Sequence, residues 1–168
     1  IIPNREIRNI FTQKILSLFK EQVAEDGKMV DEFCEALYTG NAPLVQELFT
    51  EYLNKTISIR DTFVKKPTKE NFYHGILLGI LAYKAGWTVS SNKESGDGFS
   101  DIMIQIDNSE TGIIIEIKYA EHNLEAECQK ALRQISEKRY EEELRQEGIE
   151  RILKYAITCN RKECCVTI

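Results

Sequence analysis

The residues best placed to do chemistry are Asp101 and the triplet Glu116-Ile117-Lys118, each beside an apolar run of the sequence. Side chains alternate between the two faces of a strand, so Glu116 and Lys118 point the same way while Ile117 packs on the opposite face. A turn over residues 107–112 can fold the second run back beside the first, and antiparallel pairing then brings Asp101 close to Glu116. The two carboxylates in this arrangement could hold one divalent metal ion, with the lysine beside it.

The hydrophobic pattern after residue 65 predicts the elements that must position these groups. Helical repeats, strand-like runs and turn residues give, in order, a helix over 69–85 with Thr68 as its N-cap, a strand over 87–91, a loop over 92–98, strands over 101–106 and 113–119, a helix over 123–146, and strands over 152–158 and 164–168. The order αβββαββ predicts an α/β or α+β fold in which helices flank a mixed sheet.

The first 65 residues follow a different pattern. Apolar residues recur there with the helical period in three stretches, which cover 7–19, 33–37 and 44–53. Breaks are expected at Gly27 and at Gly40-Asn41-Ala42-Pro43. Apolar stripes of this kind are usually packing surfaces and carry no catalytic groups. We therefore expect a helical linker or support segment over 1–65 and a separate domain, which carries the acidic residues, over 66–168.

Composition and charge limit the class of protein. The chain has 168 residues, of which 42% are hydrophobic, enough for one compact domain with a helical appendage. Its net charge of −5 argues against a free-standing, high-affinity nucleic-acid binder, because phosphate contacts need a surplus of Lys and Arg. Much of the acid falls between residues 137 and 150, where it could form the solvated face of a helix. Basic residues could therefore still gather near the acidic site, or lie scattered over the surface.

The sequence predicts a cytoplasmic protein without a membrane segment. No apolar stretch reaches the ~18 residues that cross a bilayer, and the N-terminus lacks the order of a signal peptide. The five cysteines show no metal-ligand spacing, so reduced thiols are expected. The chain begins with Ile1 rather than Met, and residues 2–4 have the composition of a linker, so we expect a fragment of a longer chain.

The order of elements and the acidic pair with its lysine resemble the PD-(D/E)XK nuclease superfamily. Five ordered motifs carry the resemblance, namely Glu70-Asn71-Phe72-Tyr73-His74-Gly75, Ser91-Asn92-Lys93-Glu94-Ser95-Gly96, Gly98-Phe99-Ser100-Asp101, Glu116-Ile117-Lys118 and residues 134–140. They are most similar to the domain at the C-terminus of bacterial proteins with an N-terminal AAA-ATPase-like domain, and residues 2–6 resemble the junction after that domain. Phe99 departs from the family pattern, which often has arginine there.

The resemblance implies a restriction-endonuclease-like αβββαβ core and a nuclease that uses Mg²⁺ or Mn²⁺. Asp101 and Glu116 are oxygen donors suited to Mg²⁺, and the resemblance adds the main-chain carbonyl of Ile117 as a ligand. Lys118 would position the attacking water or stabilise the charge that develops on the phosphate. The alternative for Lys118 is a surface lysine in a salt bridge.

Three further residues are candidates for the same catalytic site through the resemblance. Glu70 and His74 lie one helical turn apart, so both could reach the site from the first helix of the core. Gln134 resembles a helix glutamine that supports the site in related nucleases. The alternatives are a packed polar histidine and a surface glutamine.

The leading functional hypothesis is a metal-dependent nuclease that cleaves DNA and works under an ATPase-like domain. Two other classes stay open. One is a nuclease fold that has lost catalysis and serves as a module for nucleic-acid or protein binding, for which the low positive charge and Phe99 are the support. The other is a structural domain that binds partners through its N-terminal helices.

Overall fold

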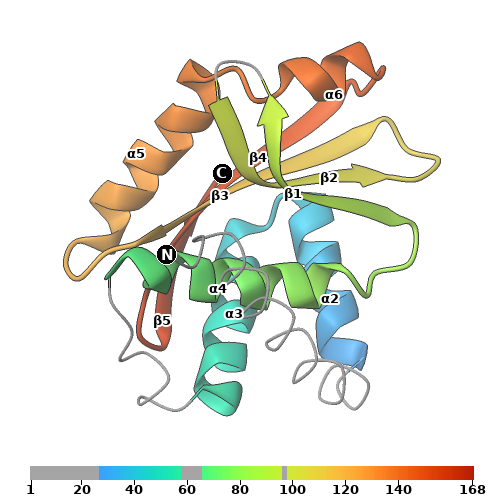
Figure 1. Ribbon diagram of the computed structural model, residues 1–168. Coiled ribbons are helices and arrows are strands. Elements are labelled where there is room, and N and C mark those ends of the chain that lie inside the picture. The colour runs from blue at the N-terminus through green and yellow to red at the C-terminus, as the bar shows by residue number, and fades with distance from the viewer. Residues whose placement is uncertain (1–26, 58–65, 96–97) are drawn as a thin grey trace, which may run out of the picture.

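The fold is known from a computed structural model that describes the backbone of residues 27–57, 66–95 and 98–168, and their side chains except at 66–68, 92–95 and 98–100 (Figure 1). Its elements are, in order, α2 (Gly27–Thr39), α3 (Ala42–Thr56), α4 (Lys66–Leu81), β1 (Trp87–Ser95), β2 (Gly98–Ile106), β3 (Thr111–Tyr119), α5 (Leu124–Glu137), α6 (Glu142–Gln146), β4 (Arg151–Asn160) and β5 (Glu163–Thr167).

The five strands form one sheet in the order β1-β2-β3-β4-β5. Only β3 and β4 are parallel, and the α5–α6 connection between them supplies the long crossover that parallel strands need. The other three pairs are antiparallel. This mixed sheet flanked by helices confirms the predicted fold class.

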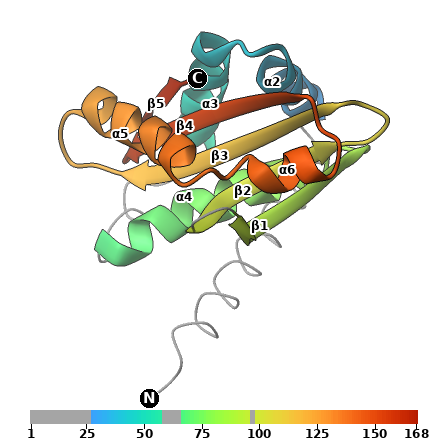
Figure 2. The same ribbon diagram turned by 90° about the horizontal axis from the view of Figure 1, so that it is seen from above.

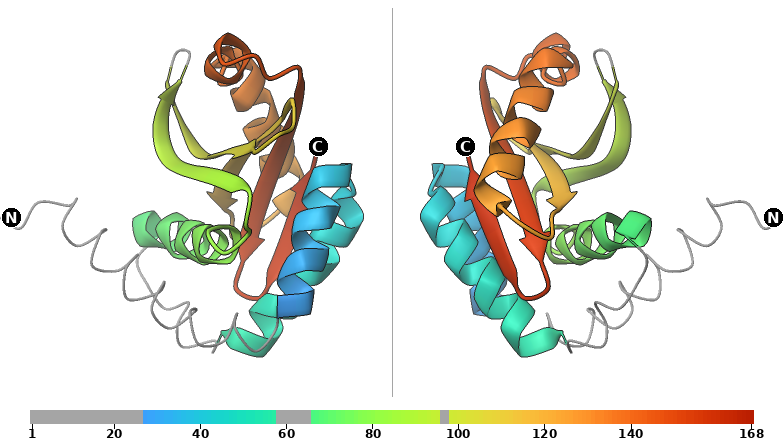
Figure 3. Two further views of the ribbon diagram at one scale, coloured as in Figure 1. Left: turned by 90° about the vertical axis from the view of Figure 1, so that its right-hand side faces the viewer. Right: turned by 90° about the vertical axis from the view of Figure 1, so that its left-hand side faces the viewer.

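Helices cover both faces of the sheet. Residues of α2, α3 and α4 share one apolar core with Ile113, Ile115 and Ile117 of β3. Ile114 points to the opposite face and packs against Ile135 of α5. Figure 3 shows α2 and α3 on one side of β4 and β5, with α5 on the other, and Figure 2 shows the same arrangement from above.

Two boundaries differ from the prediction because tertiary packing overrides the local pattern. Of the stretch 92–98, expected as a loop, residues 92–95 belong to β1 and Gly98 to β2, and the two strands pair as far as Ser95 and Gly98. The helix expected over 123–146 is interrupted after α5, where Arg139 adopts the left-handed conformation with φ of 52°. This reversal turns Tyr140 into the core, where it is 2% exposed.

The start of α4 also differs from the prediction. The helix begins at Lys66, so Thr68 lies inside its first turn rather than at its N-cap. It ends at Leu81, and Gly86 then closes the turn into β1 with φ of 78°, a conformation that glycine adopts at no steric cost.

The N-terminal helices α2 and α3 pack into the same core as the sheet. Asn41 caps α3 by accepting a hydrogen bond from the Leu44 amide, as the break predicted at residues 40–43 requires. The Tyr155 hydroxyl of β4 donates to the Leu37 carbonyl of α2 over 2.9 Å. The apolar repeat of residues 7–19 lies outside the described residues, and the division at residue 65 stays a prediction. None of the helices in the described ranges is long and apolar enough to cross a membrane.

Candidate active site

Strands β2 and β3 separate at Asp101 and Glu116. The two strands pair from Ile102 opposite Ile115 to Gln105 opposite Gly112. Beyond Ile102, β2 continues to Gly98 beside β1, whereas β3 continues to Tyr119 beside β4. Figure 3 shows the β1–β2 arm bending away from the rest of the sheet. The acidic residues therefore lie at the fork between two diverging pairs of strands.

The Asp101 carboxylate spans this fork. Its Oδ2 accepts a hydrogen bond from the Ile117 amide over 2.8 Å, in place of the backbone pairing that ends one residue earlier. Met103, two residues along β2, packs on the face covered by α5, so the alternation of a strand places Asp101 on that face too. Glu116 shares the face because it follows Ile114 by two residues.

Glu116 is the central buried acid of the site, with an exposed fraction of 2%. Its Oε1 accepts hydrogen bonds from Lys118 Nζ over 2.8 Å and from Gln134 Nε2 of α5 over 2.6 Å. Its Oε2 is buried and has no hydrogen-bond partner among the described residues. One carboxylate oxygen is thus held in place, while the other has no donor among those residues.

The pKa of Glu116 is raised to about 7, chiefly by burial and then by the negative charge of Asp101, while the Lys118 ammonium acts in the opposite direction. The pKa of Lys118 is raised as well. Its burial opposes this shift, but the hydrogen bond to Glu116 and the charges of Glu116, Asp101 and Glu70 outweigh it. The site is therefore short of positive charge, so it favours a proton or a cation at Glu116.

Gln134 and Tyr140 support the site from the α5 side. Gln134 Nε2 also lies 3.3 Å from the Tyr140 hydroxyl, to which it can donate. Burial raises the pKa of Tyr140, and the charge of Glu116 adds to the shift. Tyr140 was not among the site residues predicted individually, although it closes the motif over 134–140, and that motif was the available signal.

Helix α4 brings its first turns to the end of β3. Glu70 Oε1 accepts from the Tyr119 amide over 3.3 Å, and its charge reaches Glu116 and Lys118. Lys69 Nζ donates to the Tyr119 hydroxyl over 2.9 Å and lies 4.4 Å from the centre of its ring. Lys69 and Tyr119 were not predicted, and no local motif marks them.

His74 reaches the site from the α4 face of the sheet. It is 5% exposed, and its Nε2 lies 3.0 Å from the main-chain oxygen of Asp101 and 3.1 Å from Ser91 Oγ. The structure therefore brings Asp101, Glu116 and Lys118 together on one face, with Gln134 above them. Of the two α4 candidates, His74 meets the backbone of Asp101, and Glu70 lies at the end of β3.

The donor set fits a divalent ion with few protein ligands. The described residues contain no group of three or more His, Cys, Asp or Glu side chains arranged to hold a metal. Mg²⁺ does not need one, because it keeps several waters and takes one or two carboxylates. The buried Glu116 Oε2, which lacks a donor among the described residues, and the neighbouring Asp101 carboxylate meet that requirement.

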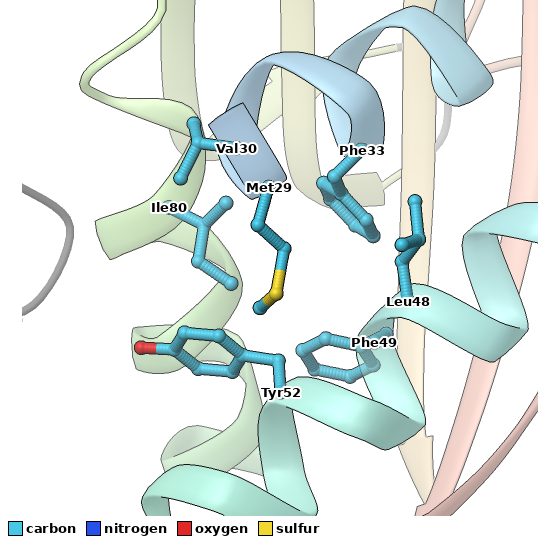
Figure 4. A pocket seen from close by; sticks show the side chains of 7 residues that line it. All are labelled: Met29, Val30, Phe33, Leu48, Phe49, Tyr52 and Ile80. Carbon is cyan, nitrogen blue, oxygen red and sulfur yellow. The ribbon is translucent and has the colours of Figure 1, made fainter. Parts of the chain in front are cut away.

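Other chemically notable features of the described residues lie away from this site. Burial raises the pKa of Cys34 and of Cys164 to about 12, so these thiols are packing residues rather than nucleophiles. All five cysteines are free, as expected. A small pocket between α2, α3 and α4 (Figure 4) is lined by Met29, Val30, Phe33, Leu48, Phe49, Tyr52 and Ile80. Apart from the Tyr52 hydroxyl, its lining is apolar and offers no catalytic group.

The helix-flanked mixed sheet, with two carboxylates and a lysine where its strands separate, is consistent with the class of restriction-endonuclease-like folds. The comparison with family models agrees, because residues 68–167, more than half of the chain, match the PD-(D/E)XK nuclease superfamily. The chain belongs to this superfamily. Searches of curated proteins and of solved structures found no match.

Proposed function

We propose that this chain is a Mg²⁺- or Mn²⁺-dependent nuclease domain that hydrolyses phosphodiester bonds of DNA. The observation that carries the proposal is the Glu116 carboxylate, which is buried, fixed through one oxygen and left without a donor among the described residues at the other. Burying such a group is costly unless a cation or a proton joins it. Membership of the superfamily supplies the nuclease class.

Asp101 and Glu116 would hold the ion, with the main-chain carbonyl of Ile117 as a further ligand. When bound, a divalent ion polarises a phosphoryl oxygen and makes a water nucleophilic at neutral pH. Its positive charge would also offset the repulsion between the two carboxylates, which raises the pKa of Glu116.

The chain's own residues would orient the reacting groups. Gln134 fixes the plane of the Glu116 carboxylate through its 2.6 Å hydrogen bond. Lys118 has 27% of its side chain exposed, so its ammonium can meet a substrate phosphate while it donates to Glu116. A positive group held in this way stabilises negative charge that develops on the phosphate, and it needs little reorganisation to do so.

The wider context of the domain is also a proposal. The motifs resemble a domain that follows an AAA-ATPase-like domain, so we place the nuclease at the C-terminus of such a cytoplasmic fusion protein. A catalytically silent nucleic-acid or protein binding module is the second candidate. The net charge of −5 favours its protein-binding form, because this charge weakens unaided binding to phosphates.

A cleavage assay with matched variants tests the proposal. The chain is freed of metal with EDTA and then supplied with Mg²⁺ or Mn²⁺ and single-stranded, double-stranded or branched DNA, with RNA for comparison. Asp101→Asn removes one charge at the fork. Asp107→Asn makes the same change beside the other end of β2, where Asp107 is exposed in the turn to β3.

We expect cleavage of DNA only with metal, a loss of at least ~10²-fold in Asp101→Asn, and unchanged activity in Asp107→Asn. Calorimetry should show that Mn²⁺ binding is weakened in Asp101→Asn and unchanged in Asp107→Asn. Metal-independent cleavage, or equal Mn²⁺ binding by both variants, would rule out the proposed metal site. Binding of DNA without cleavage under all these conditions would favour the silent module.

A further inference from the structure

His74 contacts the backbone of Asp101, at the point where β2 separates from β3. The β1–β2 register runs on both sides of Asp101, with Ile102 opposite Ser91 and Ser100 opposite Lys93, whereas the β2–β3 pairing ends at Ile102. A main-chain carbonyl that is shielded from water needs a donor, and at the half-buried Asp101 the His74 ring supplies one at 3.0 Å.

The chemistry of the two atoms assigns the ring proton. A carbonyl oxygen can only accept a hydrogen bond, so Nε2 of His74 carries a proton and donates it to the Asp101 oxygen. The Ser91 hydroxyl oxygen, 3.1 Å from the same nitrogen, can share that proton. A nitrogen that donates in this way has no lone pair free for a metal ion.

The two sides of Asp101 are thus held from opposite faces of the sheet. Its carboxylate Oδ2 accepts from the Ile117 amide on the fork side, while its main-chain oxygen accepts from His74 on the α4 side. Rotation of the Asp101 peptide would break one of these hydrogen bonds and move the carboxylate. The helix therefore restrains the acid through the backbone.

We propose that His74 is a positioning residue, which fixes the Asp101 carboxylate by donating from Nε2 to the Asp101 main chain rather than by binding the metal ion through that nitrogen. The inference rests on the proposed function only where it concerns cleavage. The hydrogen bonds from His74 to the Asp101 main chain and from the Ile117 amide to the Asp101 carboxylate do not depend on a bound metal ion.

The test combines nuclear magnetic resonance with kinetics on the whole chain. Nitrogen-15 spectra of the two histidine rings report which ring nitrogen carries a proton, and exposed His122 is the internal reference. Hydrogen exchange at the Ile117 amide reports its bond to Asp101. The variants are His74→Ala, His74→Gln, which keeps an N–H donor, and Ile80→Ala, which removes buried packing from the same helix at the pocket of Figure 4.

We expect His74 to be protonated at Nε2 without metal and to stay so when Mg²⁺ is added. His74→Ala should speed exchange at the Ile117 amide about tenfold and lower kcat by ~10–10²-fold with little change in KM for DNA. His74→Gln should recover most of both losses. Ile80→Ala should lower the melting temperature but keep the slow exchange at Ile117.

Two results would overturn the inference. The first is loss of the Nε2 proton when Mg²⁺ is added, because His74 would then be a ligand. The second is an Ile117 amide that exchanges equally slowly in His74→Ala and in the unmodified chain. If the unmodified chain cleaves no nucleic acid, the proposed function fails, while the ring and amide measurements still decide the role of His74.

Discussion

At the scale of single residues, Glu116 combines burial with a negative neighbour, so its charge works against folding. Its pKa in the folded chain is about 7, above the ordinary value of 4.5. The contribution of protonated Glu116 to the stability of the fold is fully present below pH 4.5, where the group is protonated in both the folded and the unfolded chain. This contribution is lost as the pH rises through about 7. Without a bound cation, Glu116 therefore lowers the stability of the folded chain most at pH values above about 7, where it is charged.

Replacing Glu116 by Gln should stabilise the metal-free chain at alkaline pH. The neutral amide keeps the shape of the carboxyl group and removes the buried charge, so we expect a gain on the order of 1–3 kcal/mol at pH 8 that shrinks toward pH 5. Urea unfolding at both pH values in EDTA measures it. Glu121→Gln, at an exposed loop position, is the control and should show no such dependence. A gain of Glu116→Gln that grows toward acid pH would contradict the account.

At the scale of elements, α5 carries Gln134 to Glu116, and its first turn depends on Asn123. That residue adopts the left-handed conformation with φ of 52°, and its side chain accepts from the Ala126 amide. Asn123→Ala loses the cap and strains the backbone, so we expect a loss of ~1–2 kcal/mol in thermal or urea unfolding. Asn123→Gly relieves the strain but does not restore the cap, so its stability should lie between that of Asn123→Ala and that of the unmodified chain. Equal stability of Asn123→Ala and the unmodified chain would remove the role given to this cap.

The order of the elements could be predicted because it depends on local patterns. Apolar runs and a polar turn define β2 and β3, and the alternation of side chains along a strand puts Glu116 and Lys118 on one face. The break between α5 and α6 could not be predicted, because Arg139 takes a conformation that its residue type does not favour. It does so to bury Tyr140. The contact of His74 with a main-chain oxygen was equally hidden, since residue types give no signal for a backbone partner.

At the scale of the whole molecule, α2 and α3 share one apolar core with the sheet that carries the site. Phe49 of α3 is fully buried, and its ring centre lies 6.1 Å from that of Phe33 in α2. The two helices therefore contribute to the stability of the sheet, although the match to the superfamily begins only at residue 68. A support segment of this kind can be outside the family core and still be required for folding.

Phe49→Ala should destabilise the site together with the helices. A buried Phe→Ala change typically costs ~3–5 kcal/mol, and one shared core predicts one unfolding transition. Hydrogen exchange should therefore rise together in α3 and in β3. Tyr83→Ala is the control, because Tyr83 is 42% exposed. Faster exchange in α3 with unchanged exchange in β3 would show that the helices fold as a separate unit.

DNA cleavage by Lys118→Met in Mg²⁺ or Mn²⁺, with Lys130→Met as the matched control, tests whether the site is catalytic. Lys118 donates to the buried Glu116, whereas Lys130 is an exposed residue of α5 paired with Glu127. We predict that Lys118→Met loses ~10²–10³-fold in kcat with metal and DNA binding nearly unchanged, and that Lys130→Met cleaves normally. Equal cleavage by both variants would contradict the role of Lys118, and no cleavage by the unmodified chain would contradict the assignment as an enzyme.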